Sequence, residues 1–335
     1  SPRPMLENVD SNENLLEVVS MRTIIPPLVV FMAIGLVVCQ ATARDIFVNN
    51  RSGDDRFTGH EQAVQAGGAG PVRTIEKALR LAQQGDRIQV ANTGQPYRES
   101  LSLMGTRHSG FEIQPFVLAG NGAVLDGSEP VPANAWEHYR GAVFRFKPPR
   151  IEYQQLFLNL RPATRVAVGG MDVEPPKLNA REWCLHQGFI YFAVDPQNLP
   201  GDYPLSFASK PAGITLVSVQ NVLIQDLIVQ GFQLDGISAL NSARKVRLVQ
   251  LTVRGNGRSG VTVGGASLAE LDACRVGDNG FAQLLTLPWS ETHLRQGELL
   301  SNTAPAWVDQ GGKVFRDGQE IHGGLDEFRA ASSAK

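Results

Sequence analysis

Charged and amide side chains recur in the short loops that precede a repeated strand pattern. They are Lys210, Asp235, Arg258, Asp278 with Asn279, and Asn302. A guanidinium binds a carboxylate through two parallel hydrogen bonds, so Arg258 is the candidate for a uronate carboxylate. The two aspartates could hold sugar hydroxyls or a calcium ion, although no motif supports calcium and no cofactor is expected. The alternative is a set of solvated turn residues, because Asp, Asn and Gly are ordinary turn chemistry.

A second candidate cluster combines ionisable side chains with a tryptophan. His293, Arg295 and Glu298 follow Trp289, and such a group suits sugar stacking and acid–base work. The alternative is that His293 and Arg295 face solvent while Trp289 lies in the core. Weaker candidates for a site that meets an acidic glycan are Arg244, Lys245, Arg247, Arg254, and His186 near Trp183.

The repeated strands that follow these loops lack catalytic groups. A lyase needs a base and a cation, and a glycosidase needs two carboxylates. The residues expected to face outward on the third strand of each repeat are uncharged: Thr215, Ser238, Thr262 and Ala282. No nucleophile elbow, phosphate loop, zinc motif or dinucleotide fingerprint is present. The sequence therefore leaves open whether the chain is an enzyme.

An internal repeat predicts the elements that position these residues. Residues 222–226 align with 246–250, 268–272 and, more weakly, 292–296, and each unit ends in a third strand at 236–239, 260–263 or 280–283. Such units bury their apolar side chains only when they stack. A leucine-rich horseshoe is the main rival, but its frame does not recur. The residues expected inside are Ile224, Val229, Ile237, Leu248, Val253, Val261 and Val263, and those expected to stack at a sharp turn are Asp226, Gln250, Asp272 and Gln296.

An amphipathic helix is predicted ahead of the first repeat. Ile75, Ala78, Leu79 and Ala82 follow helical spacing, and Thr74 is a suitable N-cap. An amphipathic helix at that position would cover the open end of the apolar core.

The segment around this helix resembles a known family. The string Gly70-Pro71-x-x-Thr74-Ile75-x-x-Ala78-Leu79-x-x-Ala82-x-x-Gly85-Asp86-x-Ile88-x-Val90, followed by Tyr97-Arg98-Glu99, is similar to the N-terminal cap of secreted pectin-lyase-like proteins. The resemblance implies an all-β, right-handed parallel β-helix that acts on or binds polysaccharide, as a lyase or glycosidase of acidic glycans. The alternative is a non-catalytic exported β-helix that binds glycan or has a structural role at the cell surface or in the periplasm.

The chain is expected to be exported. Met21-Arg22, an apolar run over 24–39 and Ala41-Thr42-Ala43 are typical of a signal peptide, so 21–43 would be removed and the acidic stretch 1–20 would be a non-native extension. The alternative is a membrane anchor through 24–39. The single mature domain, 44–335, would comprise the cap and first strands (44–100), an aromatic-rich insertion (136–203), regular coils (204–310) and a tail (311–335).

Composition narrows the remaining possibilities. The net charge of −2 gives no electrostatic footprint for nucleic acid. The 34 glycines, 20 prolines and 7% aromatic content favour short strands joined by turns. Export permits a disulfide between Cys184 and Cys274, but two isolated cysteines do not decide whether they pair.

Overall fold

The computed structural model describes residues 43–149, 153–170, 172–322 and 328–329, and residues Thr42–Lys335 form one compact unit. The expected signal peptide and upstream extension therefore lie outside the described residues, apart from position 43. In the described part of the chain, no helix has the length and apolar character needed to cross a bilayer.

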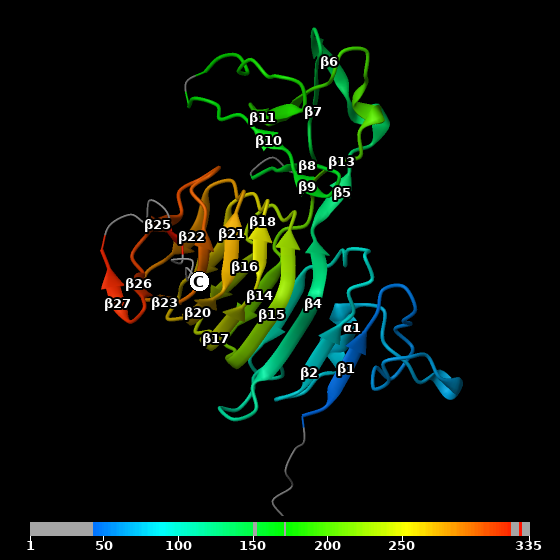
Figure 1. The fold of residues 1–335 in the computed structure, drawn as a ribbon, viewed down its shortest axis with the longest axis vertical. Coiled ribbons are helices and arrows are strands. Elements are labelled where there is room, and N and C mark those ends of the chain that lie inside the picture. The colour runs from blue at the N-terminus through cyan, green and yellow to red at the C-terminus, as the bar shows by residue number, and fades with distance from the viewer. Residues whose placement is uncertain (1–42, 150–152, 171, 323–327, 330–335) are drawn as a thin grey trace, which may run out of the picture. The chain divides into compact units, whose positions relative to one another are not determined.

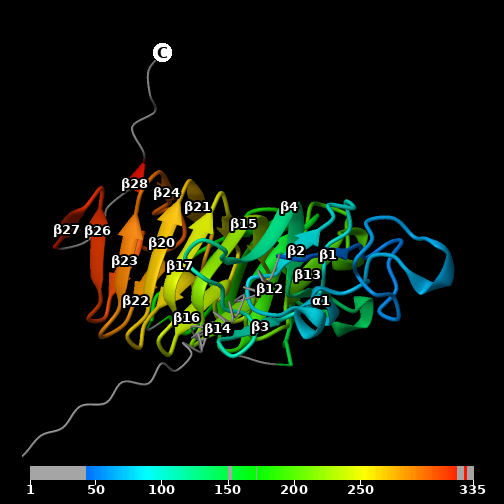
Figure 2. The ribbon, with the colours of Figure 1, turned by 90° about the horizontal axis from the view of Figure 1, so that it is seen from below.

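The fold is all-β, and its two main sheets run side by side through the molecule (Figures 1 and 2). The small sheet has six parallel strands: β3 (Leu101–Met104), β14 (Ile214–Val217), β16 (Ile237–Leu240), β19 (Ser259–Val263), β22 (Ala282–Thr286) and β25 (Trp307–Asp309). The large sheet contains β1 (Asp45–Val48), β2 (Arg87–Val90), β4 (Phe116–Asp126), β15 (Gln220–Gln230), β17 (Arg244–Val249), β18 (Thr252–Arg254), β20 (Leu268–Asp272), β21 (Cys274–Gly277), β23 (Glu291–Leu294), β24 (Gly297–Leu299), β26 (Lys313–Arg316), β27 (Gln319–Ile321) and β28 (Phe328–Arg329). We call the chain from one small-sheet strand to the next a coil.

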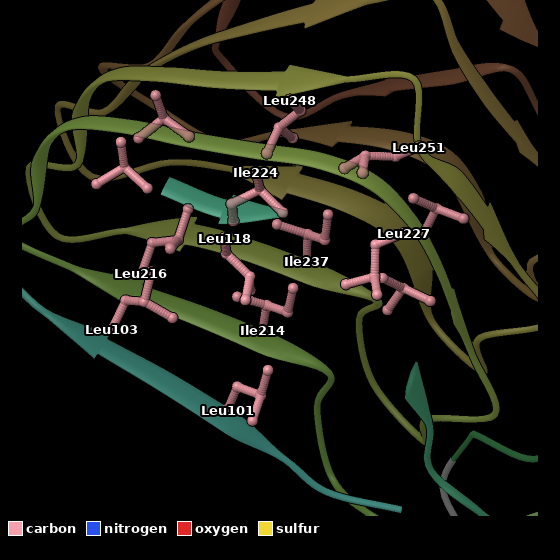
Figure 3. Packing of buried hydrophobic residues seen from close by; sticks show 14 of the residues in the cluster. Leu101, Leu103, Leu118, Ile214, Leu216, Ile224, Leu227, Ile237, Leu248 and Leu251 are labelled. Atoms are coloured by element: carbon pink, nitrogen blue, oxygen red, sulfur yellow. The ribbon is translucent and has the colours of Figure 1, made fainter. Parts of the chain in front are cut away.

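Apolar side chains from both sheets fill the space between them. Leu118, Ile224 and Leu248 lie at matching positions of three adjacent large-sheet strands and are fully buried. Figure 3 shows them facing Leu101 and Ile214 of the small sheet. All seven residues predicted to point inward belong to this cluster. Each such side chain stabilises the fold by about 1.5–3 kcal/mol through burial.

A left-handed residue marks a bend at the same level of four neighbouring coils, within β4 and β15 and between the strand pairs β17–β18 and β20–β21. The φ angles are 50° at Asn121, 50° at Asp226, 54° at Gln250 and 52° at Ala273. Asn and Asp adopt this conformation more readily than other non-glycine residues. The predicted stacking of Asp226 with Gln250 is confirmed. The prediction for Asp272 is wrong, because Asp272 pairs with Val249 and Ala273 occupies the bend.

The repeat alignment was also shifted in its later coils. Val246 pairs with Ala269, one residue after the predicted Leu268. In the small sheet Val261 pairs with Leu284, three residues after the predicted Phe281. Ala282 therefore has the parity of the inward-facing Leu284 and does not face outward as expected. The chain advances seven residues from Ala239 to Val246 but only six between the corresponding residues Val263 and Ala269, so the later coil is one residue shorter at this turn. A repeat search that matches only short apolar runs does not detect such a change.

The predicted helix is present as α1 (Ile75–Leu81), with the Thr74 hydroxyl accepting a hydrogen bond from the Lys77 amide at 3.1 Å. Ile75, Ala78 and Leu79 are buried in the main core cluster. His108, after β3, holds the helix in place: Nε2 donates to the Leu79 carbonyl and Nδ1 accepts from the Met104 amide, both at 2.9 Å.

The chain leaves the coils after Gly127 and returns at Ser209, and the intervening residues form two further sheets. One contains β5 (Ser128–Pro130), β8 (Leu156–Leu158), β9 (Arg161–Pro162) and β13 (Leu205–Ala208); the other contains β6 (Glu137–Arg140), β7 (Val143–Phe146), β10 (Thr164–Arg165), β11 (Glu182–His186) and β12 (Phe189–Ala193). The predicted hairpin is confirmed as β11–β12. We call residues 128–208 the insertion; its strands lie beyond the ends of β4 and β15 (Figure 1) and have their own apolar clusters.

Candidate functional site

The insertion meets the coils along a polar contact that we call the seam. Gln230, the last residue of β15, donates from Nε2 to the Leu160 carbonyl at 3.0 Å. Gln155 donates from Nε2 to the Asn256 carbonyl at 3.4 Å, and its own carbonyl accepts from the Ala208 amide at 3.0 Å. The seam thus brings side chains of the insertion against the turns that end the large-sheet strands.

A pocket of about 260 Å³ opens at the seam. Glu129 and Phe207 line it from the insertion, and Ser209, Lys210 and Gln233 line it from the coils, together with Pro149 and Pro211. Gln233 is held by a hydrogen bond from Nε2 to the Ala208 carbonyl at 3.3 Å. A carboxylate, an ammonium, an amide, a hydroxyl and an aromatic ring therefore face one small space. These groups can hydrogen-bond sugar hydroxyls and pack on a ring face.

Two of the predicted site residues bind each other. Arg258 donates to Asp235 from Nε at 2.8 Å and from Nη2 at 2.6 Å. Asp235 is 1% exposed and also accepts from Ser238 at 2.6 Å and Ser259 at 2.9 Å. Four donors satisfy this carboxylate. The expected use of the Arg258 fork on a uronate is not what the structure shows, because the fork is engaged by Asp235.

Asp278 binds a different partner from this pair. It follows β21, and its backbone and side chain bind Asn302 at 3.0 and 2.8 Å. Asn279, expected in a loop, is fully buried and accepts from Asn256 Nδ2 at 3.0 Å. Asp278 begins the turn between β21 and β22, whereas Arg258 ends the equivalent turn between β18 and β19 in the preceding coil.

Sequence reasoning missed a polar row at the ends of equivalent large-sheet strands. Asp126, Gln230 and Arg254 occupy paired positions on β4, β15 and β18. Arg254 donates from Nε to Gln230 Oε1 at 3.0 Å, and Arg98 lies 3.8 Å from Asp126. Burial lowers the pKa of Arg254, while Asp278 and Asp126 oppose that shift. The signal available in the sequence was a polar residue at the end of each strand, one coil apart.

The second predicted cluster is only partly assembled. His293 Nε2 lies 2.6 Å from Glu291 Oε1, and its ring stacks on Phe315 with centroids 4.9 Å apart. His293 and Arg295 line a pocket of about 450 Å³ with Asp272, Gln296 and Asp317. Glu298 is not part of that pocket and pairs with Arg275 at 3.3 Å. Trp289 is 86% exposed, so the alternative that placed it in the core is wrong.

The weaker candidates take separate structural positions. Lys245 pairs with Glu112 at 3.2 Å, whereas Arg254 belongs to the seam, so the basic run does not form one surface. His186 is buried in the insertion and bonds to the Val173 carbonyl at 3.1 Å. Cys184 and Cys274 are free, and burial raises their thiol pKa values to about 11 and about 12. Among the residues that the structure describes, no metal-binding group of three His, Cys, Asp or Glu side chains occurs.

Comparison with known proteins finds similarity in structure but none in sequence. No family profile matches the chain, and no curated protein matches its sequence. A structure titled "Glycoside hydrolase" is similar over 80% of this chain and 74% of its own length, with 11% identity and a TM-score of 0.52. A complex of XylC with xylose shares 14% identity over 75% of this chain, has a TM-score of 0.49, and is spanned over only 58% of its length. The Eubacterium ramulus lacto-N-biosidase of family GH136 shares 10% identity over 82% of this chain and 55% of its own length, with a TM-score of 0.26.

Proposed function

We propose that this chain is an exported, right-handed parallel β-helix protein of the pectin-lyase-like kind that binds polysaccharide in the seam pocket. The observation that carries the proposal is the convergence of Glu129 and Phe207 of the insertion with Lys210 and Gln233 of the coils around one pocket. Helix α1 closes the N-terminal end of the core in this proposal, which agrees with the burial of its apolar face.

The chemistry of the pocket suits an oligosaccharide. Lys210 makes no ion pair with a carboxylate in the described part of the chain, so its ammonium remains available to hydroxyl or acidic groups. Glu129 is exposed and accepts from sugar hydroxyls when ionised. The two groups come from opposite sides of the seam, so a bound sugar would be held between the insertion and the coils.

Hydrolysis is the second candidate function, because the fold is shared with a structure titled as a glycoside hydrolase. Fold alone does not determine activity. A glycosidase needs two carboxyl groups about 5–9.5 Å apart, and Glu129 is the one carboxylate among the described residues lining the pocket. Asp235 is already saturated by four donors. We therefore place binding ahead of catalysis.

A glycan screen tests both functions together. Protein starting at Arg44 is incubated with polyuronates, sulfated glycans and neutral plant and algal polysaccharides, and binding is read beside reducing ends and unsaturated products. Retention of a glycan without product supports the binding function, and new reducing ends support hydrolysis. Failure to bind any polysaccharide would contradict the proposal.

A further inference from the structure

Lys210 is the cation on the coil side of the seam, and Arg165 is a second cation on the insertion side. Arg165 of β10 pairs across to Trp183 of β11, and its guanidinium carbon is 5.2 Å from the centroid of the indole ring. Trp183 is fully buried and anchored by a hydrogen bond from Nε1 to the Ala163 carbonyl at 3.1 Å. A guanidinium stacked on a fixed indole ring has a restricted orientation. Arg165 is therefore held in place from one side by the insertion itself.

The other side of Arg165 faces the coils together with a second donor. A Cβ atom added at Gly280 would lie 2.2 Å from the Gly257 carbonyl oxygen, 2.9 Å from Arg165 Nη1 and 3.0 Å from Gln155 Nε2. Within the described residues, Gln155 Nε2 donates one hydrogen bond, to the Asn256 carbonyl, and it is long at 3.4 Å. Two hydrogen-bond donors thus lie close to one point beside the backbone of Gly280, next to the Gly257 carbonyl. Two converging donors favour an acceptor or an anion between them.

Arg165 has no counter-charge in the described residues. The partly buried Arg258 is paired with Asp235 and the exposed Arg181 with Asp195, but Arg165 is partly buried and no carboxylate contributes to its electrostatic environment. Burial lowers the pKa of its guanidinium, which is still charged at neutral pH. A desolvated charge without a partner is costly to the fold. Such a cost is offset when a ligand supplies the anion.

We infer that Arg165, with Gln155 as a second donor, binds the acidic group of the glycan, either a uronate carboxylate or a sulfate ester. The inference rests on the proposed function and specifies its ligand class. Gln155 links the position of Arg165 to the seam pocket. Its backbone carbonyl accepts a hydrogen bond from the Ala208 amide, and Ala208 directly precedes Ser209 and Lys210 of that pocket. Arg165 thus takes the role that the sequence suggested for Arg258.

The test uses calorimetric titration of the protein that starts at Arg44. The probes are hexagalacturonate, its methyl ester and a sulfated carrageenan hexasaccharide; the ester removes the charge and keeps the sugar chain. Arg165→Gln should weaken binding of an acidic probe by about tenfold or more, which is typical for a lost charge-assisted contact. Binding of the methyl ester should not change. The acidic probe that loses more affinity identifies carboxylate or sulfate as the group recognised.

Two further variants separate recognition from folding. Arg140→Gln removes one positive charge from an exposed pair of the insertion and should leave all affinities unchanged. Arg165→Lys keeps the charge without the planar fork, and should retain part of the preference for acidic probes at an unchanged melting temperature. Equal loss of affinity for the acid and the ester in Arg165→Gln, or no loss, would overturn the inference. Binding of neutral glycans alone would also overturn it and leave the proposed function standing, whereas binding of no glycan would overturn both.

Discussion

Arg258 holds both carboxylate oxygens of Asp235, at 2.8 and 2.6 Å, just ahead of two neighbouring small-sheet strands. Residues one coil apart in the sequence thereby form an ion pair whose carboxylate is buried. Removing one partner of a buried pair leaves the other charge uncompensated, which costs about 3–5 kcal/mol. The pair therefore supports the fold at the edge of the small sheet.

The first prediction follows from this pair. Arg258→Ala should lower the free energy of unfolding by a few kcal/mol, because Asp235 would keep only its two serine donors. Chemical denaturation measures the effect. Arg275→Ala, which breaks the exposed pair with Glu298, is the matched control and should cost no more than about 1 kcal/mol. Similar stability of the two variants would show that the Asp235 pair is not structural.

The second prediction concerns the register of the small sheet. Val261→Asp should destabilise the protein by several kcal/mol, because the residue is 1% exposed inside the main core. Ser102→Asp, on the exposed outer side of β3, should change the melting temperature little. Thr262 cannot serve as that control: it is 0% exposed and its hydroxyl lies 2.6 Å from that of Ser259. A tolerated Val261→Asp would mean that the register is wrong.

Much of the fold could be predicted from the sequence because the apolar positions repeat. Alternation alone placed Ile224, Leu248 and Val261 in the core. Loop length was harder to predict: the turn between β19 and β20 is one residue shorter in register than its counterpart in the preceding coil, and Leu284, in place of Phe281, lies opposite Val261.

The site was less predictable because the sequence does not distinguish a charged turn residue that is available to a ligand from one that pairs with another side chain. Asp235 and Arg258 were read as ligand groups, yet they satisfy each other. Glu129 and Arg165 lie in the insertion, where no repeat sets their positions. Their proximity to the coils could not be deduced from sequence spacing.

The third prediction concerns pH. Burial lowers the pKa of His108 below its ordinary value of 6.5, and its Nδ1 accepts from Met104 only when neutral. The unfolded chain therefore binds a proton at a higher pH than the folded chain. Stability attributable to His108 should be fully present above about pH 6.5 and should decline as the pH falls toward the lowered pKa. Melting temperatures of wild type and His108→Gln between pH 7.5 and 4.5 measure this, and an identical slope in both would exclude His108 as the cause.

The fourth prediction concerns export. Arg44 already binds Asp86 through its backbone amide at 3.3 Å and through its guanidinium at 2.6 Å. Cleavage after Ala43 would add an α-ammonium beside that carboxylate, a favourable charge pairing. Secreted protein should therefore begin at or near Arg44 when its N-terminus is sequenced. Material that retains residues before Met21 would contradict the prediction.

The account depends most directly on the seam pocket as the place where glycan binds. The decisive measurement is the affinity of Lys210→Ala for the glycan that the wild-type protein binds best in the screen, compared with that of Lys245→Ala. Lys245 is a surface lysine that pairs with Glu112 and does not line the seam pocket. Each variant therefore loses one positive charge, but only Lys210→Ala loses it from the pocket. The account predicts a loss of about tenfold for Lys210→Ala, with Lys245→Ala close to wild type. Equal affinities of both variants and wild type would place the glycan elsewhere and contradict the account.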